Sequence, residues 1–462
     1  MTLLERLLDF AGSTGWHLVG PALDVLPPPL RARVVARRLA LGGSLLASRD
    51  LPLLPRHSAV LTVVDVDCDV PFDGPPCLAS SSSPPETRQS ASVVDGRWAD
   101  LVAARLSGEH WAGWLESFAA SSSRLDALSL PQVSLRDAHC LAAHVDGVRH
   151  LDLSRTSLHK DDLARLVRGL EDTLCSLAVS AVRQGDCAEL ETAMGKVDGR
   201  LRRLHVTGSR LGDGDLAWIR AAASRLETLS VRFNPGLTSE ALCALVRNDL
   251  PSVRELSIGL IDNVDDDVAD ALADAPIRLC ALDISRSSVS DDGLARLVRV
   301  QYRLERLNVT SCDGIGAAGV RAVAASLRDL RVLVLNFTDV DDDALAHVAA
   351  SCRKLAVLRV SACHLVTDTG IGALHPLADS LCALSLGGGR ISDDVIPHIA
   401  RLTSLQALSL WSTAVSAAGV ARLAATLDVA PPGDADGAIL LGREPTQDAD
   451  NGATGFIFDE IV

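Results

Sequence analysis

An aliphatic pattern, L-x-x-L-x-(L/V/I), returns at nearly constant intervals through most of this chain of 462 residues. The twelve copies lie 23 to 27 residues apart and start at Leu125, Val148, Leu174, Leu201, Leu226, Val253, Leu279, Leu304, Leu330, Leu355, Leu381 and Leu405. A period of this length is typical of proteins in which each repeat buries its apolar side only against its neighbours. Aromatic residues make up only 3% of the chain, so branched aliphatic side chains must fill these layers.

Each repeat predicts one strand, one turn and one helix. Side chains alternate across a strand, so the three aliphatic residues of the pattern point inward. A polar stretch then leads into a helical period, as in residues 292–298 (DGLARLV) and 343–348 (DALAHV). We therefore expect an α/β fold, a leucine-rich-repeat solenoid (horseshoe) with a parallel concave sheet and convex helices.

Some copies also carry cysteines at fixed places in the repeat. The fullest is CRKLAVLRVSACHLVTDTGIGAL at residues 352–374, and partial copies are LNVTSC, which ends at Cys312, and VSDDGLARLV, which begins at Val289. Over about residues 125–427 the pattern resembles the cysteine-containing leucine-rich-repeat proteins, as in the F-box/leucine-rich-repeat (RNI-like) group. The resemblance implies the solenoid fold, but one fold can carry many functions.

The ends of the array predict four regions. Residues 1–58 are expected to form a helical cap over the first layer, and residues 59–124 an irregular first repeat. The latter begins with a strand at Leu61-x-x-Val64-x-Val66 and continues into a Pro- and Ser-rich disordered insertion at 69–95. Helical segments are expected at 98–106 and 111–118, twelve repeats at 125–427, and an acidic, largely disordered tail at 428–462.

The N-terminal segment allows a second interpretation. Leu26-Pro27-x-x-Leu30-x-x-x-Val34 is similar to the opening of an F-box, a helical module that docks a ubiquitin-ligase adaptor. The sequence departs from that pattern at Pro29, where an acidic residue is usual, and at Arg38, where a hydrophobic residue is usual. Residues 1–58 are therefore either a plain cap or a degenerate F-box-like segment.

Net charge and cysteine content limit the partners and the compartment. The formal net charge is −15, which disfavours nucleic acid because phosphate binding needs clustered cations. The 11 cysteines are odd in number and form no CxxC pair, which favours a reducing compartment, the cytoplasm or the nucleus. We expect no membrane span, because no apolar run approaches the roughly 20 residues that one needs.

Three patterns imitate catalytic or ligand sites. Residues 314–319 (GIGAAG) match GxGxxG, but Gly319 occupies a repeat position that also holds Gly293 and Gly370. Aspartate runs such as 265–267 and 341–343 recur just before each predicted helix, where a carboxylate caps free N–H groups. Cysteines at matching repeat positions are expected to be packing residues. From the sequence we therefore expect that the protein is not an enzyme and that it has no catalytic residues, no cofactor and no metal site.

We expect binding on the concave face, which is the usual docking surface of a solenoid. The predicted contact residues are Arg203, His205, Arg232, Asp283, Arg306, Asn308, Arg359 and Trp411. Arg203, His205 and Arg232 form a predicted basic spot for an acidic peptide or phosphopeptide, unless the arginines merely pair with nearby carboxylates. Trp411 is either an exposed interface anchor or a cover for the last layer.

These observations favour a protein–protein interaction scaffold that binds a protein partner on its concave face. One alternative is a substrate-recognition subunit of a cullin-type ubiquitin ligase, whose residues 1–58 would bind an adaptor. A second alternative is a regulator of a small GTPase or another enzyme, although no set of residues in the sequence is typical of that function.

Overall fold

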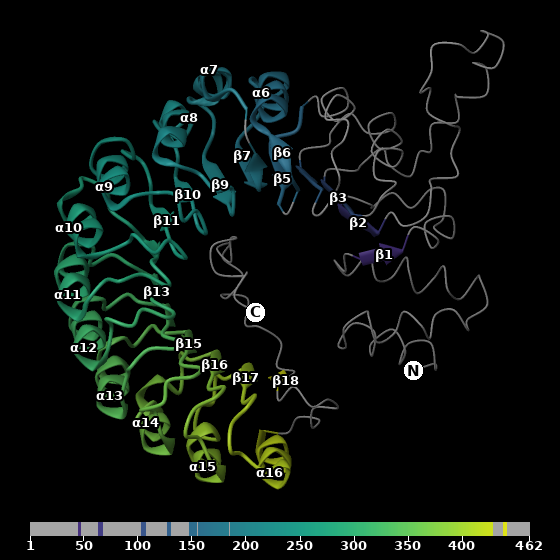
Figure 1. Ribbon diagram of the computed structural model, residues 1–462. Coiled ribbons are helices and arrows are strands. Elements are labelled where there is room, and N and C mark those ends of the chain that lie inside the picture. The colour runs from purple at the N-terminus through teal and green to yellow at the C-terminus, as the bar shows by residue number, and fades with distance from the viewer. Residues whose placement is uncertain are drawn as a thin grey trace, which may run out of the picture. The chain divides into compact units, whose positions relative to one another are not determined.

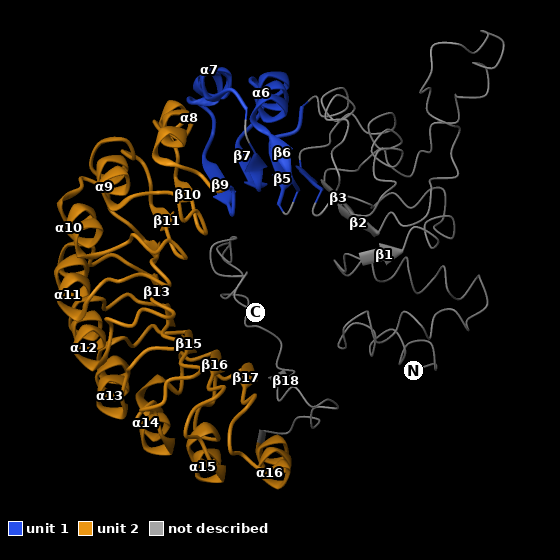
Figure 2. Cartoon of the chain, in the orientation of Figure 1, with its two compact units in different colours: residues 1–209 blue, residues 210–462 orange. Residues whose placement is uncertain are grey.

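The computed structural model describes residues 45–47, 63–67, 103–107, 127–130, 147–154, 156–183, 185–427 and 438–440. The chain has two compact units, unit 1 at residues 1–209 and unit 2 at residues 210–462 (Figure 2). The division falls inside the predicted repeat array, after Ser209 and before Arg210. Each unit is described by itself below.

Unit 1 contains parallel strands joined by helices. Its strands follow in chain order, with each hydrogen-bonded to the next in parallel: β1 (Leu45–Ala47), β2 (Val63–Asp67), β3 (Ala103–Ser107), β4 (Ala127–Ser129), β5 (His150–Leu153), β7 (Ser176–Ser180) and β9 (Arg203–Thr207). A second parallel pair consists of β6 (Leu158–His159) and β8 (Val182–Arg183). The described helices are α6 (Lys160–Gly169) and α7 (Cys187–Val197).

Unit 2 repeats the same arrangement. Its strands are β10 (Thr228–Ser230), β11 (Glu255–Ser257), β12 (Ala281–Asp283), β13 (Arg306–Asn308), β14 (Val332–Val334), β15 (Val357–Arg359), β16 (Ala383–Ser385), β17 (Ala407–Ser409) and β18 (Ala438–Leu440). Neighbours from β10 to β17 pair in parallel, and β18 pairs antiparallel with β17. The helices are η4 (Asp213–Asp215), α8 (Leu216–Ala221), α9 (Ser239–Asn248), α10 (Asp266–Asp274), α11 (Asp291–Val300), α12 (Ala317–Ser326), α13 (Asp342–Ser351), α14 (Asp368–Gly372), η5 (His375–Leu377), η6 (Asp393–Val395), α15 (Ile396–Ile399) and α16 (Ala417–Leu427).

The aliphatic pattern of the sequence coincides with these strands. All twelve predicted copies carry a strand, β4, β5, β7 and β9 in unit 1 and β10 to β17 in unit 2. In the β13 copy the three anchors Leu304, Leu307 and Val309 have no exposed surface. Within unit 2 the helices lie on the outer side of the curved sheet (Figure 1), so the core is the layer between strands and helices. The predicted α/β leucine-rich-repeat solenoid is confirmed.

Three strands lie where the sequence predicted something else. β3 replaces the end of the helix expected at 98–106, β1 lies inside the expected helical cap, and β18 lies inside the expected disordered tail. In each case the segment pairs with a neighbouring strand, and this pairing outweighs the weak helical or irregular preference of its own residues. The strand predicted from Leu61 is confirmed as β2, whereas most of residues 1–58 and all of 69–95 lie outside the described residues.

At several helix starts an aspartate forms hydrogen bonds to the next repeat. Asp265 caps its own helix α10 by accepting from Val268 N at 3.2 Å. The next residue, Asp266, accepts from the backbone N of Ser290 at 2.8 Å and from Ser290 Oγ at 2.6 Å, one repeat further on. The same pair of bonds joins Asp213 to Thr238, Asp342 to Thr367, Asp368 to Ser392 and Asp393 to Ser416. The predicted capping role is confirmed for Asp265 and Asp341, whereas Asp368 and Asp393 follow a Thr or Ser cap and link repeats instead.

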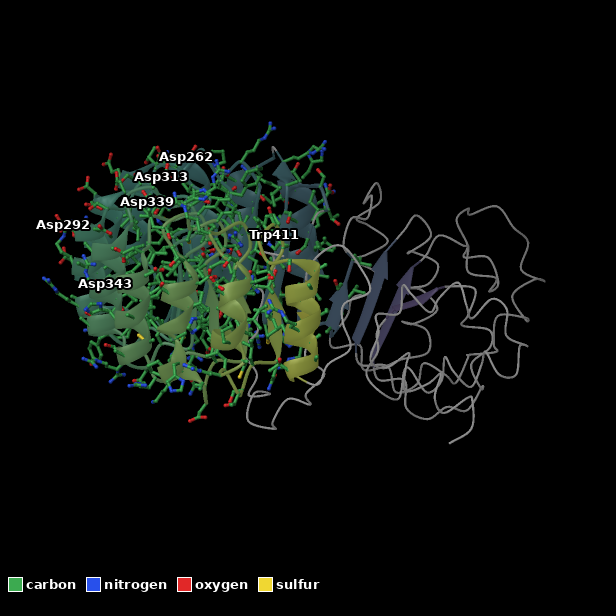
Figure 3. The ribbon with its side chains drawn as sticks, turned by 90° about the horizontal axis from the view of Figure 1, so that it is seen from below. Asp262, Asp292, Asp313, Asp339, Asp343 and Trp411 are labelled. Carbon is green, nitrogen blue, oxygen red and sulfur yellow. The ribbon has the colours of Figure 1, made fainter. Side chains whose placement is uncertain are left out.

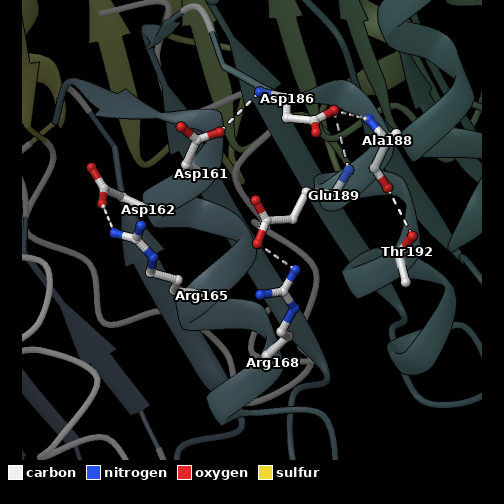
Figure 4. A network of polar contacts seen from close by, with 8 residues as sticks. All are labelled: Asp161, Asp162, Arg165, Arg168, Asp186, Ala188, Glu189 and Thr192. Atoms are coloured by element: carbon white, nitrogen blue, oxygen red, sulfur yellow. Dashed lines mark hydrogen bonds and ion pairs between the residues drawn. The ribbon is translucent and has the colours of Figure 1, made fainter.

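Unit 1 carries a variant of this link (Figure 4). Asp161 accepts from the backbone N of Asp186 at 2.8 Å, and Asp186 itself caps α7 by accepting from Ala188 N at 2.8 Å. An ion pair between Arg168 and Glu189, 2.6 Å long, joins the bodies of α6 and α7. Adjacent repeats are therefore joined by directed polar bonds as well as by the shared core.

The repeated helix glycine makes room for these aspartates. A Cβ on Gly293 would lie 2.6 Å from Cγ of Asp266, and one on Gly370 would lie 2.8 Å from Cγ of Asp342. Such distances are far inside ordinary contact, so any other residue would push the carboxylate away. The Asp–Gly spacing is thus a packing constraint of the repeat.

Candidate protein-binding face

The third residue of each parallel strand in unit 2, β10 to β17, forms one column across the sheet. Strand register places these residues side by side in the order Ser230, Ser257, Asp283, Asn308, Val334, Arg359, Ser385 and Ser409. They alternate with the buried anchors, so their side chains leave the strand on the face opposite the helices. Ser257, Asp283 and Asn308 have no exposed surface, whereas Arg359 and Ser385 are half-buried. We call this column and its flanking strand residues the concave face.

An ion pair on this face spans three strands. Arg306 Nη2 on β13 lies 2.5 Å from Glu255 Oε1 on β11. The residue between them in register is Ala281 on β12, whose short side chain leaves the space that the arginine crosses. The side chains of Arg306 and Glu255 are 12% and 23% exposed, so water screens this pair less than a surface pair.

A second ion pair also skips one strand, and it joins Arg232, two residues beyond β10, to Asp283, the last residue of β12. Arg232 Nε lies 3.1 Å from Asp283 Oδ2, and the two side chains are 8% and 0% exposed. Gly259 belongs to the intervening repeat, and a Cβ there would lie 2.8 Å from Asp283 Oδ1. The same Cβ would overlap Ser285 Oγ, so any other residue at this position would displace Asp283 or Ser285. Both pairs fix arginines across the centre of the concave face.

Hydrogen bonds hold the acidic and amide residues of the column as well. Asp283 accepts from Ser257 Oγ at 2.8 Å and from the backbone N of Ser285 at 3.0 Å. Asn308 Oδ1 accepts from the backbone N and the hydroxyl of Thr310, at 3.0 and 2.7 Å. Side chains held in this way lose little conformational entropy when a partner binds.

Unit 1 shows the same local motif around Asp152. That carboxylate accepts from Ser129 Oγ at 2.7 Å and from the backbone N of Ser154 at 2.9 Å. The sequence form Asp/Asn-x-Ser/Thr at the end of a strand therefore has a physical meaning in both units. The side chain closes a local turn and stays on the concave side.

The basic spot expected from the sequence is weaker than predicted. Arg203 is exposed, but His205 is 8% exposed, and burial, only partly offset by Asp152, lowers the pKa of His205 to about 4. The imidazole is thus neutral near pH 7 and supplies no positive charge there. Arg232 is a buried member of an ion pair, so its expected exposure is wrong and the pairing alternative holds for it. Arg203 and Arg232 belong to different units, and their convergence remains an untested prediction.

Trp411 follows β17 and is 48% exposed (Figure 3). Its ring lies over the turn of the preceding repeat, because a Cβ on Gly387 would fall 2.6 Å from Cε2 of Trp411. The glycine therefore accommodates the indole. One face of the ring packs on the turn and the rest remains available to a partner.

Sequence reasoning missed the residues that shape the centre of the face. Glu255, Gly259, Ala281 and Ser285 were not predicted, although they set the ion pairs and the turn. A usable signal was present, because the intervening strand or turn carries a very small residue beside each arginine, Ala281 beside Arg306 and Gly259 beside Arg232. The predicted members Arg306, Asn308, Asp283 and Arg359 do lie on one face.

The sequence patterns that resemble nucleotide-binding or catalytic motifs have structural roles in the repeats. Asp291 Oδ1 accepts from the backbone N of Gly316 and of Gly319, both at 2.8 Å, so a carboxylate of the preceding repeat fills the GxGxxG turn. Burial raises the pKa of the Cys352 thiol to about 11, and it also raises those of Cys312 and Cys363. These thiols are therefore poor nucleophiles.

The described residues carry no group of three or more His, Cys, Asp or Glu side chains placed to hold a metal ion. Asp262, Asp313 and Asp339 are exposed on separate turns along one edge of unit 2 (Figure 3). Among the same residues, none of the helices combines the length and the apolar character that crossing a bilayer demands.

A family model described as "Leucine Rich repeat" matches residues 304–324, which span β13 and the start of α12. This match and the repeated strand–helix architecture show that the chain has the leucine-rich-repeat fold. Its likeness to a chain in the crystal structure of the yeast Rad7 and Elc1 complex agrees, with a TM-score of 0.50, 15% identity and coverage of 83% of this chain and 89% of that one. At this level of identity the likeness concerns the fold.

Two curated relatives share sequence with the repeats. The Tonsoku-like protein of Bos taurus is 29% identical over 283 residues, which is 56% of this chain and 19% of that protein. Coronatine-insensitive protein homolog 1b of Oryza sativa subsp. japonica is 31% identical over 217 residues, 45% of this chain and 33% of that protein. The leucine-rich-repeat protein thus spans a third or less of each relative. The second match supports the resemblance to the F-box/leucine-rich-repeat group.

Proposed function

We propose that this leucine-rich-repeat protein is a non-catalytic scaffold that binds a protein partner on the concave face of unit 2. The observation that carries the proposal is the ordered polar surface of strands β11 to β15. Glu255 holds Arg306 on β13, Asp283 holds Arg232 just beyond β10, and a local turn holds Asn308 and Thr310. A surface already held in one arrangement favours specific recognition, because binding need not order it.

Affinity purification with matched variants tests this function. Arg359→Glu with Ser385→Glu changes two half-buried residues of the concave face that lie outside both ion pairs. Arg321→Glu with Ser326→Glu makes the same chemical change on α12, on the outer side of the sheet. We expect the concave variant to lose a partner that the wild type captures, while the α12 variant retains it. Retention of every partner by the concave variant would contradict the proposal.

A second candidate function is substrate recognition within a cullin-type ubiquitin ligase. It is supported by the likeness to a chain in the crystal structure of the Rad7 and Elc1 complex and by the coronatine-insensitive relative. In this proposal the concave face of unit 2 holds the substrate, and residues 1–58, most of which lie outside the described residues, bind the adaptor. The F-box-like residues Leu26, Pro27 and Leu30 are the proposed contacts.

The adaptor proposal has its own test. Pro27→Ala with Leu30→Asp in the full chain should abolish co-purification of a ligase adaptor while leaving the concave-face partner bound. Pro28→Ala with Leu39→Asp is the control, since it removes one proline and one leucine outside the F-box-like positions. An adaptor that is absent from the wild-type purification would remove the ligase role and leave the scaffold role standing.

A further inference from the structure

The edge of unit 2 at which the strands begin carries a row of arginines. The segments that lead from α10, α11, α12 and α13 into the next strand each hold one, at intervals of 25 residues: Arg278, Arg303, Arg328 and Arg353. All four are exposed. Because β12 to β15 pair in parallel as neighbours, the four segments lie side by side along this edge. We call these four residues the basic row.

None of the four arginines pairs with a carboxylate among the residues that the structure describes. Arg278 donates to the backbone O of its neighbour Ile277 at 2.9 Å, and Arg353 donates to two backbone carbonyls at 3.2 and 2.9 Å. The guanidinium of Arg303 lies 5.9 Å from the centroid of the Tyr302 ring. A carbonyl or a ring carries only partial negative charge, so these contacts leave the positive charges of the basic row in place.

The carboxylates in the same four segments are already paired. These segments hold six cations and two carboxylates. Glu305 lies 3.5 Å from Arg331, and Asp329 lies 2.6 Å from Lys354. The cations that remain are the four arginines of the basic row.

The opposite edge of these repeats is negative. The segments that lead from β11, β12, β13 and β14 into α10 to α13 hold five carboxylates and one cation, Arg286. Asp262, Asp313 and Asp339 are among these carboxylates (Figure 3). The two edges therefore carry opposite net charge, and an anionic partner is attracted to the edge that holds the basic row.

The spacing of the basic row suits an extended polypeptide. Neighbouring strands lie about 4.8 Å apart and packed helices about 8 to 10 Å apart, so arginines between them are spaced by about 5 to 10 Å. Alternate side chains of an extended chain lie about 6.6 Å apart and point to one side. A peptide with Asp or Glu at alternate positions can therefore place one carboxylate against each arginine. Tyr302, which is 52% exposed, adds an apolar contact beside Arg303.

We propose that the basic row binds an extended acidic segment of a protein partner, with carboxylates against the four guanidinium groups and an apolar side chain against Tyr302. A guanidinium can bind a carboxylate through two parallel hydrogen bonds, which favours Asp and Glu side chains. Nucleic acid fits less well, because Tyr302 is the one aromatic residue of the four segments and single strands stack successive bases on several rings. This surface lies apart from the concave face, so the inference goes beyond the proposed function.

The test is fluorescence anisotropy of a labelled peptide in which Glu alternates with Ser, titrated with the full chain at low ionic strength, where charge contacts are screened least. Arg303→Glu with Arg328→Glu should weaken binding by about tenfold or more, because two attractive contacts become repulsive. Arg286→Glu with Arg390→Glu is the control. It makes the same change in net charge at two exposed arginines of the opposite edge, and it should bind the peptide as the wild type does.

Three results would overturn the proposal. The first is a wild type that does not bind the peptide, and the second is equal weakening in both variants, which would show an effect of net charge alone. The third is tighter binding of a uridine oligonucleotide of the same length, which would assign the row to nucleic acid. If the double variant fails to fold, Arg328→Gln removes one exposed charge and should weaken peptide binding by about twofold or more. Failure here leaves the scaffold proposal untouched, because the concave face takes no part in the test.

Discussion

Substitution of Gly293 by alanine should destabilise the protein, although glycine-to-alanine changes inside helices normally stabilise them. Gly293 is the third residue of α11, and its Cβ would lie 2.6 Å from Cγ of Asp266 in the preceding repeat. The carboxylate would have to leave Ser290, whose backbone N and hydroxyl donate to it at 2.8 and 2.6 Å. These bonds, with Arg296, hold the pKa of Asp266 below its usual value against the opposing effect of its burial.

The magnitude follows from the bonds lost and the helix propensity gained. Hydrogen bonds to a charged acceptor contribute about 1.5 to 3 kcal/mol each, and Asp266 is part-exposed, so the lower value applies to both. Alanine returns up to about 1 kcal/mol of helix propensity. We expect a net loss of about 2 kcal/mol in the free energy of unfolding.

Urea denaturation followed by circular dichroism measures this change. Gly195→Ala is the matched control, because Gly195 lies inside α7 and its Cβ would meet nothing within 4 Å. The control should gain about 0.5 to 1 kcal/mol. If Gly293→Ala stabilised the protein as much as Gly195→Ala, the claim that the Asp266 carboxylate requires a glycine at position 293 would be refuted.

Three further changes test other parts of the structure. Leu307→Ala removes a fully buried anchor from a middle layer and should cost about 2 to 5 kcal/mol by denaturation, whereas a loss below about 1 kcal/mol would place Leu307 outside the core. Ala281→Leu should cost about 1 to 3 kcal/mol and separate Arg306 from Glu255, because the larger side chain fills the space the arginine crosses; wild-type stability would contradict this route. The pKa of His205 lies at about 4 in the folded chain against 6.5 when unfolded, so the unfolded state binds the proton first and stability should fall as pH drops from 6.5 to 4, by about 3 kcal/mol. His205→Gln should flatten that part of the pH profile measured by urea denaturation, and an unchanged slope would mean that His205 is not the group responsible.

The repeat frame could be predicted because it depends on a pattern repeated many times. Anchors such as Leu304 and Leu307 recur with the same spacing, so an error in one copy is corrected by the next. The residues of β1, β3 and β18 do not carry the repeated pattern. These segments become strands because they pair with a neighbouring strand. Sequence periodicity therefore predicts the middle of a solenoid better than its ends.

The sequence predicted which residues share the concave face, but it did not predict the ion pairs and hydrogen bonds among them. Alternation along β13 places Arg306 and Asn308 on one face, and this needed no coordinates. The ion pair of Arg306 with Glu255 joins residues 51 positions apart and skips a strand, which no local pattern encodes. The burial of His205, and hence its neutral state, likewise depends on three-dimensional neighbours.

The central claim, that partners bind the concave face of unit 2, is tested most directly by site-specific photo-crosslinking in the full chain. A photoreactive residue at Arg359 or Ser385 reports from that face, and one at Arg321 or His347 reports from the outer helices α12 and α13. We predict that a co-purifying protein crosslinks from positions 359 and 385 and not from 321 or 347. Crosslinks from the helix positions alone would contradict the account.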